Sequence, residues 1–273
     1  MNCVICLPVK NCEKHLLNVF SNLLIINQLF IKTSIIFGYD NSKDNSLKLL
    51  HTFKNSNKHI DIVILENTQK PHKYRTHNLE YIRNWMLEIV HERYSHYNYY
   101  ITIDSDDVCA TPIDINILKK HIDNETNWDV LSFNKPSYYD IWALQYDIFV
   151  HHFRCLSYNS NPVICYIRDD IKNKLNNLNE NEYFQVHSAF NGFGIYKLKY
   201  LKNIKYDGKT QYYFSTEKVQ HMIDYLNNHV KNKRKTIQIT DSAENCEHIG
   251  LHISMINKYN DVKIMVTKDI LFN

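Results

Sequence analysis

The sequence has little glycine or proline, with five residues of each among 273. This scarcity excludes collagen-like and low-complexity chains, which depend on those two residue types. Basic and acidic side chains nearly balance, at 32 and 29, so the charge gives no reason to expect DNA or RNA as the main partner. With 44% hydrophobic and 22% charged residues, the composition is that of a packed globular protein.

Long apolar runs are also missing. The stretch 23–26 is far shorter than the ~20 residues that span a bilayer, and residues 1–10 lack the two regions of a secretory signal. We therefore expect no transmembrane segment, a cytoplasmic location and reduced cysteines. Cys3 and Cys6 spell C-x-x-C, but they lie in an apolar run without a second such pair, so we interpret them as buried structural residues.

Strand and helix patterns alternate through the first 111 residues. Short apolar runs predict strands at 2–8, 33–38, 60–65 and 99–103, and amphipathic segments predict helices at 14–30, 45–53 and 78–93. Such an alternation predicts an α/β fold with a Rossmann-type, mixed but mostly parallel sheet flanked by helices.

The pattern after residue 112 is less regular. It predicts strands at 128–133, 192–196, 236–239 and 262–266, a polar helix or loop at 169–181, and a helix at 247–255. No repeat or linker divides the chain. We therefore expect a single domain with a nucleotide-binding lobe at 1–111 and an acceptor-binding lobe at 112–273.

Three carboxylates follow the fourth expected strand, in Asp-Ser-Asp-Asp at 104–107. Ligands of parallel sheets bind at the carboxyl ends of the strands, where Lys10 and Asp40 also fall. Like charges this close repel each other unless a cation lies among them, and Mg²⁺ or Mn²⁺ binds such oxygens together with substrate phosphates. The alternative is a solvated turn before the next helix. The position at a strand end favours a metal–diphosphate site.

With these motifs in place, the chain resembles the family-2 nucleotide-sugar glycosyltransferases, which have the GT-A fold. The motifs are Pro-Val-x-Asn at 8–11, Asp-Asn-Ser-x-Asp at 40–44, Arg-Asn at 83–84 and Asp-Ser-Asp-Asp at 104–107. The resemblance covers residues 3–112 and returns weakly at 246–255. The frequent Asn, Lys, Ile and Tyr residues are also similar to those of giant-virus glycosyltransferases, which would place the protein in a host cytoplasm.

The resemblance implies a site for a nucleoside diphosphate sugar, with UDP favoured. The residues assigned to the donor nucleotide are Pro8, Val9, Lys10, Asp40, Asn41, Arg75, Arg83, Asp104 and Ser105. Among them, Asp40 would hold the base. Arg75 and Arg83 are candidates for the diphosphate, because arginine suits bidentate phosphate contacts, with a purely structural charge as the alternative for each.

The resemblance also implies a divalent cation, Mn²⁺ or Mg²⁺, as cofactor. Asp106 would be its main ligand, and Asp104 would meet the ribose or the metal. A cation there would stabilise the charge of the departing nucleoside diphosphate. His248 and His252 share a helix face. We expect one of them, assigned as His252, to reach this cation, with packing beside the helix as the alternative.

Glu247 and His248 stand where the family carries Glu-Asp, the source of the general base in inverting enzymes. Because His248 replaces the second acid, the base is Glu247 or His248, or it is absent in a retaining mechanism.

Two further segments are candidates for contacts with the sugar or the acceptor. Asn191 and Gly192 suit a close backbone approach beneath the sugar, or simply a tight turn. Tyr139, Asp140 and Trp142 combine aromatic faces with a carboxylate, which suits sugar rings as well as core packing.

These observations predict a metal-dependent glycosyltransferase, of the hexosyl or pentosyl class, that moves a sugar to a hydroxyl of a glycan or protein acceptor. One alternative is a nucleotidyltransferase acting on sugar phosphates, for which the sequence lacks a Gly-rich phosphate segment. The other is a non-catalytic carbohydrate-binding protein with a decayed transferase fold. The sugar, the acceptor, the stereochemical outcome and the oligomeric state stay open, with a homodimer among the options.

Overall fold

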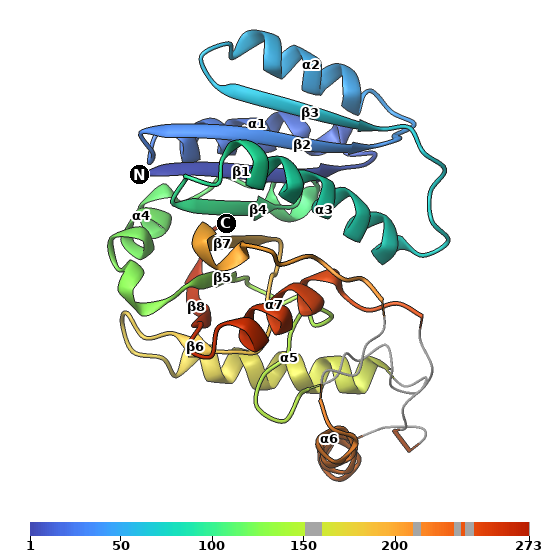
Figure 1. Ribbon diagram of the computed structural model, residues 1–273. Coiled ribbons are helices and arrows are strands. Elements are labelled where there is room, and N and C mark those ends of the chain that lie inside the picture. Colours follow the sequence, from blue (N-terminus) through green and yellow to red (C-terminus); the bar gives the residue numbers. More distant parts are fainter. Residues whose placement is uncertain (151–159, 210–213, 232–235, 238–242, 273) are drawn as a thin grey trace.

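One continuous sheet organises the computed structural model, which describes residues 1–150, 160–209, 214–231, 236–237 and 243–272 (Figure 1). Its strands are β1 (Asn2–Val9), β2 (Lys32–Asp40), β3 (Asp61–Asn67), β4 (Tyr99–Ile103), β5 (Val130–Asn134), β6 (Phe184–Gln185), β7 (Phe193–Lys197) and β8 (Ile264–Ile270). Their order across the sheet is β3-β2-β1-β4-β7-β5-β8-β6. Strands β1 to β4 are parallel, whereas β7 runs antiparallel to both β4 and β5. The predicted mixed, mostly parallel sheet is therefore confirmed.

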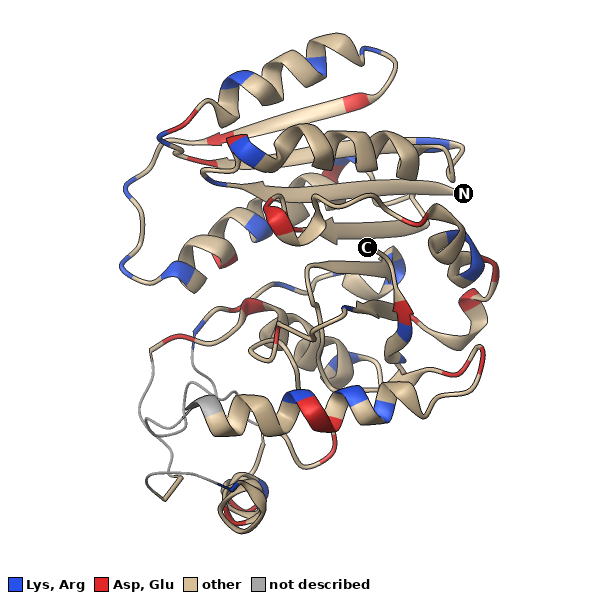
Figure 2. Cartoon of the chain, turned by 180° about the vertical axis from the view of Figure 1, so that it is seen from behind, with Lys and Arg blue, Asp and Glu red and all other residues tan. Residues whose placement is uncertain are grey.

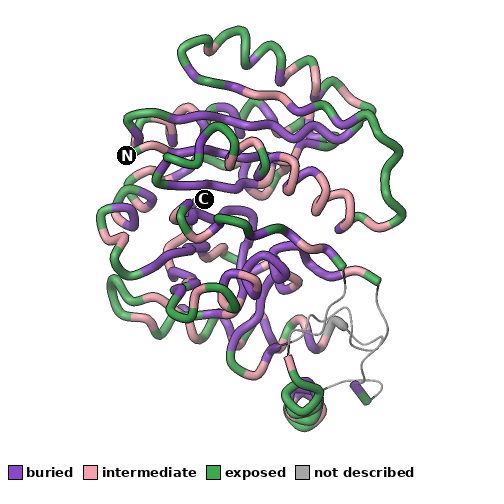
Figure 3. Tube along the Cα trace, viewed as in Figure 1, coloured by how far each residue is buried: buried purple, intermediate pink, exposed green. Residues whose placement is uncertain are grey.

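Helices cover both faces of this sheet. On one face lie α1 (Glu13–Asn27), α2 (Ser46–Ser56) and α4 (Ile115–Asp123); on the other lie α3 (Arg75–Arg93), α5 (Ser160–Asn176) and α7 (Glu247–Lys258). Helix α6 (Thr216–His229) joins the core of that second face from farther away, beyond α5 (Figure 1). In β1, Val4 and Cys6 join the core beneath α3, while Cys3 and Ile5 join the core beneath α1. Since both faces are covered, β1 is apolar from Cys3 to Val9 rather than alternating, and most of it is buried (Figure 3).

The predicted elements of the first half agree with the structure to within about three residues at each end. The second half agrees less well, because α4 and α6 have no predicted counterpart and α5 begins at Ser160 rather than 169. Most of the strand predicted at 236–239 lies outside the described residues. The division into lobes at residue 111 stays a prediction.

The chain order opens a crevice at the carboxyl ends of β1 and β4. From β1 the chain builds β2 and then β3 in one direction, and it returns to place β4 on the other side of β1. In open α/β sheets, ligands bind at such a reversal of strand order. Lys10, which follows β1, and the 104–107 turn, which follows β4, both lie at this reversal.

Charged side chains of both signs are interspersed along the helices and connections (Figure 2). This distribution agrees with the nearly balanced composition. Within the described part of the chain, we find no helix that is both long and apolar enough to cross a membrane.

Candidate active site

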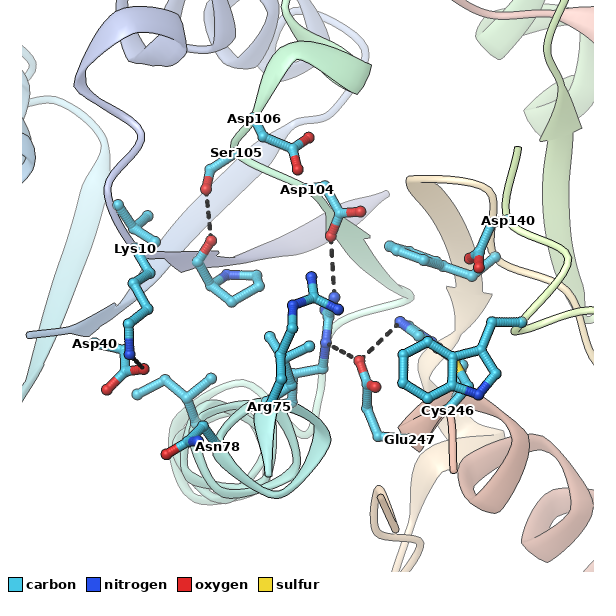
Figure 4. A pocket seen from close by; sticks show the side chains of 18 of the residues that line it. Lys10, Asp40, Arg75, Asn78, Asp104, Ser105, Asp106, Asp140, Cys246 and Glu247 are labelled. Carbon is cyan, nitrogen blue, oxygen red and sulfur yellow. Dashed lines mark hydrogen bonds and ion pairs between the residues drawn. The ribbon is translucent and has the colours of Figure 1, made fainter. Parts of the chain in front are cut away.

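A pocket with a volume of about 540 Å³ lies at the reversal of strand order (Figure 4). It is formed by the ends of β1 and β2, the start of α3, the 104–107 turn, the loop after β5 and the start of α7. All of the site residues predicted from the sequence line it, apart from Asn41, Asn191, Gly192 and His252. The topology thus brings together residues that are up to 240 positions apart, from Pro8 to His248.

One end of the pocket is organised around Asp40, the last residue of β2. Lys10 Nζ donates to Asp40 Oδ2 at 2.6 Å, and Asn67 Nδ2 donates to Oδ1 at 3.0 Å. Asp40 is buried, whereas the Lys10 side chain is 45% exposed. A carboxylate and an ammonium group are therefore held side by side at the pocket wall. Asn41 is exposed and adopts a positive φ of 37°, so its place is in the turn after β2 rather than in the pocket lining.

Backbone hydrogen bonds hold the 104–107 turn in place. The amide of Asp104 donates to the Gly192 carbonyl at 2.9 Å, and Asp106 Oδ1 accepts from the Val108 amide at 3.2 Å. Ser105 Oγ donates to the Pro8 carbonyl at 2.6 Å, which ties the turn to β1. The Ser105 hydroxyl is therefore engaged within the protein, while the side chains of Asp104 and Asp106 line the pocket.

A buried arginine, Arg83 of α3, occupies the centre of the site. Its Nε donates to Glu247 Oε1 at 2.9 Å, one terminal nitrogen donates to Thr102 Oγ1 at 2.6 Å, and the other donates to Asp104 Oδ1 at 3.1 Å. Burial alone would lower the pKa of Arg83, but Glu247 and Asp104 raise it above its ordinary value. Arg83 thus directs its donors at protein groups, in agreement with the structural alternative considered for it.

The carboxylates of Asp104 and Asp106 suit a divalent cation. Burial, reinforced by the charge of Asp106, raises the pKa of Asp104 to about 7 although Arg83 lowers it. Mg²⁺ and Mn²⁺ bind through one or two carboxylates together with phosphate and water. No group of three or more His, Cys, Asp or Glu side chains forms a metal cage within the described residues. The pair would therefore hold the ion jointly with a substrate phosphate.

Arg75 is a cation available to a ligand. It is the first residue of α3, it is exposed, and it lines the pocket near Asp104 (Figure 4). Its side chain makes no hydrogen bond or ion pair with any described residue. Helix N-termini favour anions, and the Thr76 amide at this N-terminus donates to the Glu244 carboxylate at 3.4 Å. The Arg75 guanidinium at the same helix start therefore suits a diphosphate.

Sequence reasoning missed several lining residues on the same helix. Asn78, Leu79 and Ile82 follow Arg75 at helical spacing and line the pocket beside it, and Lys73 precedes the helix. The spacing from Arg75 is the signal that would have identified the helical residues.

The opposite end of the pocket is formed by the loop after β5. Tyr139 donates its hydroxyl to Asp104 Oδ2 at 3.4 Å. Within the described part of the chain, the Asp140 carboxylate accepts from two groups, the amides of Ala143 and Asn191, at 3.2 and 3.3 Å. Burial raises the pKa of Asp140 to about 6. Trp142 lines the same wall, so an aromatic face and a carboxylate lie together there.

Asn191 and Gly192 lie beneath the acidic turn rather than in the pocket, which corrects the expectation of a floor for the sugar. Asn191, at φ 56°, donates from Nδ2 to the Phe133 carbonyl at 3.0 Å. Gly192 has φ 90°, and a Cβ there would lie 2.5 Å from Val108 Cγ1. The tight-turn alternative is the one that the structure supports.

The structure also corrects the expected metal contact of His252. This residue is fully buried, Nδ1 lies 2.9 Å from Ser188 Oγ, and Nε2 lies 2.9 Å from the Tyr196 hydroxyl. Both ring nitrogens are therefore engaged in the core, and burial lowers the pKa of His252 to about 3.

His248, one turn earlier on α7, does line the pocket. Its ring stacks on Phe190, with 3.8 Å between centroids, and neither nitrogen has a hydrogen-bond partner among the described residues. Burial, together with the charge of Arg83, holds its pKa well below the usual range. His248 is therefore a neutral ring at the pocket wall.

Comparison with known proteins bears on the fold. No protein-family model matches the chain, and no curated protein matches it in sequence. Among solved structures, TarS from S. aureus aligns with a TM-score of 0.51 and 13% identity over 100% of this chain and 36% of its own. A structure of residues 1–349 of TarS in complex with UDP-GlcNAc aligns with a TM-score of 0.49 and 14% identity. The alignment covers 100% of this chain and 57% of that structure.

A third structure is the mannosyltransferase PcManGT from Pyrobaculum calidifontis, in complex with GDP-Man and Mn²⁺. It aligns with a TM-score of 0.44 and 12% identity over 75% of this chain and 47% of its own. The chain thus spans between about a third and three fifths of the length of these structures. The likeness to TarS confirms the GT-A-like, single-domain fold predicted from the sequence. These structures lend no support to a viral source.

Proposed function

We propose that this protein is a metal-dependent glycosyltransferase that moves a sugar from a nucleoside diphosphate sugar, with UDP favoured, to a hydroxyl of a glycan or protein acceptor. The observation that carries the proposal is the order of groups along one pocket (Figure 4). Lys10 and Asp40 lie at one end, Arg75 and the acidic turn at the centre, and Asp140 at the other end. This order suits a base, a diphosphate and a sugar in succession.

At the base end, Asp40 would accept from an N–H of the nucleobase while Lys10 donates to a neighbouring carbonyl. Uracil presents an N–H between two carbonyl groups, which matches this pair. TarS, whose fold this chain shares, has been crystallised with UDP-GlcNAc. That precedent supports the choice of donor class.

At the centre, Asp104 and Asp106 would hold Mn²⁺ or Mg²⁺. When bound, the ion would stabilise the negative charge that develops on the departing nucleoside diphosphate. Arg75 would bind the same diphosphate through its guanidinium, and the start of α3 adds a favourable dipole. Val9 and Pro8, at the end of β1, would pack along the nucleoside.

A nucleotidyltransferase is the less favoured enzyme class. Such an enzyme is expected to cradle triphosphate with a Gly-rich loop, yet no glycine lines the pocket formed by the described residues. A decayed, non-catalytic protein is also less favoured, because the pocket keeps both the acidic pair and a free arginine.

The decisive test compares Asp106→Asn with Asp107→Asn. Asp107 is the exposed neighbour outside the pocket, so its variant is a matched control. We expect UDP and Mn²⁺ together to raise the melting temperature of the wild type, since a ligand that binds only the folded state stabilises it. We expect Asp106→Asn to lower nucleotide release from UDP-GlcNAc by about 10²-fold or more. Equal turnover in the two variants would refute the metal assignment.

The finer parts of the proposal are the hexosyl or pentosyl class, the choice between Mn²⁺ and Mg²⁺, a glycan or protein as acceptor, a homodimer and a cytoplasmic location. These stay predictions.

A further inference from the structure

Five carboxylates line the pocket: Asp40, Asp104, Asp106, Asp140 and Glu247. They differ in whether a cationic side chain forms an ion pair with them. Lys10 forms an ion pair with Asp40 at 2.6 Å. Arg83 forms ion pairs with Asp104 at 3.1 Å and with Glu247 at 2.9 Å. Asp106 and Asp140 have no ion-pair partner in the part of the chain that the structure describes. Of these two, Asp106 belongs to the turn proposed to bind the cation.

Glu247 is poorly placed to act as a base. Its side chain is 5% exposed and its Oε1 accepts from the Arg83 guanidinium, which is itself buried. This hydrogen bond already occupies one carboxylate oxygen of Glu247. The ion pair also fixes the first turn of α7 against α3. Both properties are those of a residue that positions other groups.

Asp140 has the opposite environment. Among the described residues, only the backbone amides of Ala143 and Asn191 donate to it, at 3.2 and 3.3 Å, so each oxygen keeps a lone pair for another donor. It lies at the far end of the pocket from Asp40 (Figure 4), and Trp142, two residues further along the chain, also lines the pocket. The titratable and charged groups that share this part of the pocket are Asp104, Tyr139, Arg75, Arg83, Cys246, Glu247 and His248.

We propose that Asp140 is the catalytic base of the transfer and that Glu247 is a positioning residue. This inference rests on the proposed function. The acceptor oxygen attacks the anomeric carbon, and a new C–O bond forms as the bond between that carbon and the diphosphate oxygen breaks. The electron pair of the broken bond leaves with the nucleoside diphosphate, and the hydroxyl proton passes to an Asp140 Oδ atom.

The protonation behaviour of Asp140 agrees with this role. Burial, together with the charge of Glu247, raises the pKa of Asp140 to about 6, while Arg75 and the two amides lower it. A general base works best when its pKa lies near the operating pH. Asp140 is thus ionised at neutral pH and still able to accept a proton.

The experiment uses the full chain with Mn²⁺, with UDP-GlcNAc and GDP-mannose as donor probes and water as the acceptor. Nucleotide release reports the reaction, because water loses a proton in the same way as an acceptor hydroxyl. We expect Asp140→Asn to lower kcat by about 10²- to 10⁴-fold while the Kd for UDP stays unchanged. Asp140→Glu should recover part of the activity because it restores a carboxylate. Asp147→Asn, an exposed change in the same loop outside the pocket, should behave as the wild type.

The pH profile separates a base from a structural residue. In the wild type kcat should fall as the pH drops through about 6, whereas Asp140→Asn should lack this acidic limb. Glu247→Gln should keep the limb while it changes KM and stability. Retention of the limb in Asp140→Asn, or its loss in Glu247→Gln alone, would overturn the assignment. A wild type that releases no nucleotide from either donor would instead reject the proposed function.

Discussion

Arg83 Nε donates to Glu247 Oε1 at 2.9 Å, and the two residues are 164 positions apart in the chain. Both side chains are nearly inaccessible, at 2% and 5% exposure. The same guanidinium reaches Asp104 and Thr102. One side chain of α3 therefore fixes the start of α7 and the acidic turn relative to each other.

Removing this guanidinium should destabilise the fold. Arg83→Met leaves the Glu247 and Asp104 carboxylates buried without a cation, so we expect the free energy of unfolding to fall by about 3–5 kcal/mol. Urea denaturation measures it. Arg93→Met, at the exposed end of the same helix, is the control and should change stability by less than about 0.5 kcal/mol. A stable Arg83→Met protein would mean that the ion pairs are not needed for the fold.

Asp40 should act on the nucleobase alone. Asp40→Asn removes a charged acceptor, so we expect UDP to bind roughly tenfold more weakly, while pyrophosphate with Mn²⁺ binds as in the wild type. Calorimetric titration with the two ligands measures the difference. Glu66→Gln, an exposed change on β3 outside the pocket, serves as the control. An equal loss of affinity for UDP and for pyrophosphate would place Asp40 at the phosphates instead.

Gly192 should be intolerant of a side chain. Gly192→Ala forces alanine to φ 90° and brings its Cβ to 2.5 Å from Val108 Cγ1, so we expect a loss of about 1–3 kcal/mol. The double variant Gly192→Ala/Val108→Ala removes the contact with Val108 but neither the backbone strain nor the 3.1 Å approach to the Tyr139 hydroxyl, and it should recover only part of the loss. Thermal unfolding of the three proteins tests this order. Full recovery of stability in the double variant would show that the backbone conformation at residue 192 contributes nothing to the loss.

Acid should destabilise the protein through His252. Its pKa is about 3 in the folded protein because the ring is buried, against an ordinary value of 6.5. Between these values the unfolded chain binds a proton that the folded one does not. Stability is therefore fully present above pH 6.5 and falls as the pH drops, by up to about 1.4 kcal/mol per pH unit.

Unfolding of the wild type, His252→Gln and His59→Gln between pH 7 and 4 tests this effect. The His252 variant should show the shallower dependence on pH, and the exposed His59 variant should follow the wild type. Identical slopes in all three proteins would contradict the role of His252.

Local patterns predicted the first half of the fold well. The strand expected at 99–103 is β4 with the same bounds, because five consecutive apolar or β-forming residues end abruptly at Asp104. Alternation with amphipathic helices then predicted a parallel sheet. The rule that ligands bind at strand ends placed Asp40 and Asp104 at the same pocket. Each of these inferences needs only the spacing of residue types along the chain.

By itself, the sequence determined the order of the elements in the first half of the chain, the sheet type and the strand ends that carry acidic residues. Only the tertiary structure decided which of those residues are free to react. His252 is paired with Ser188 and Tyr196, and Glu247 with Arg83, across separations of 56 to 164 residues. The reason is physical: a buried polar side chain takes its partner from whatever element packs against it, and that choice leaves no periodic trace in the local sequence.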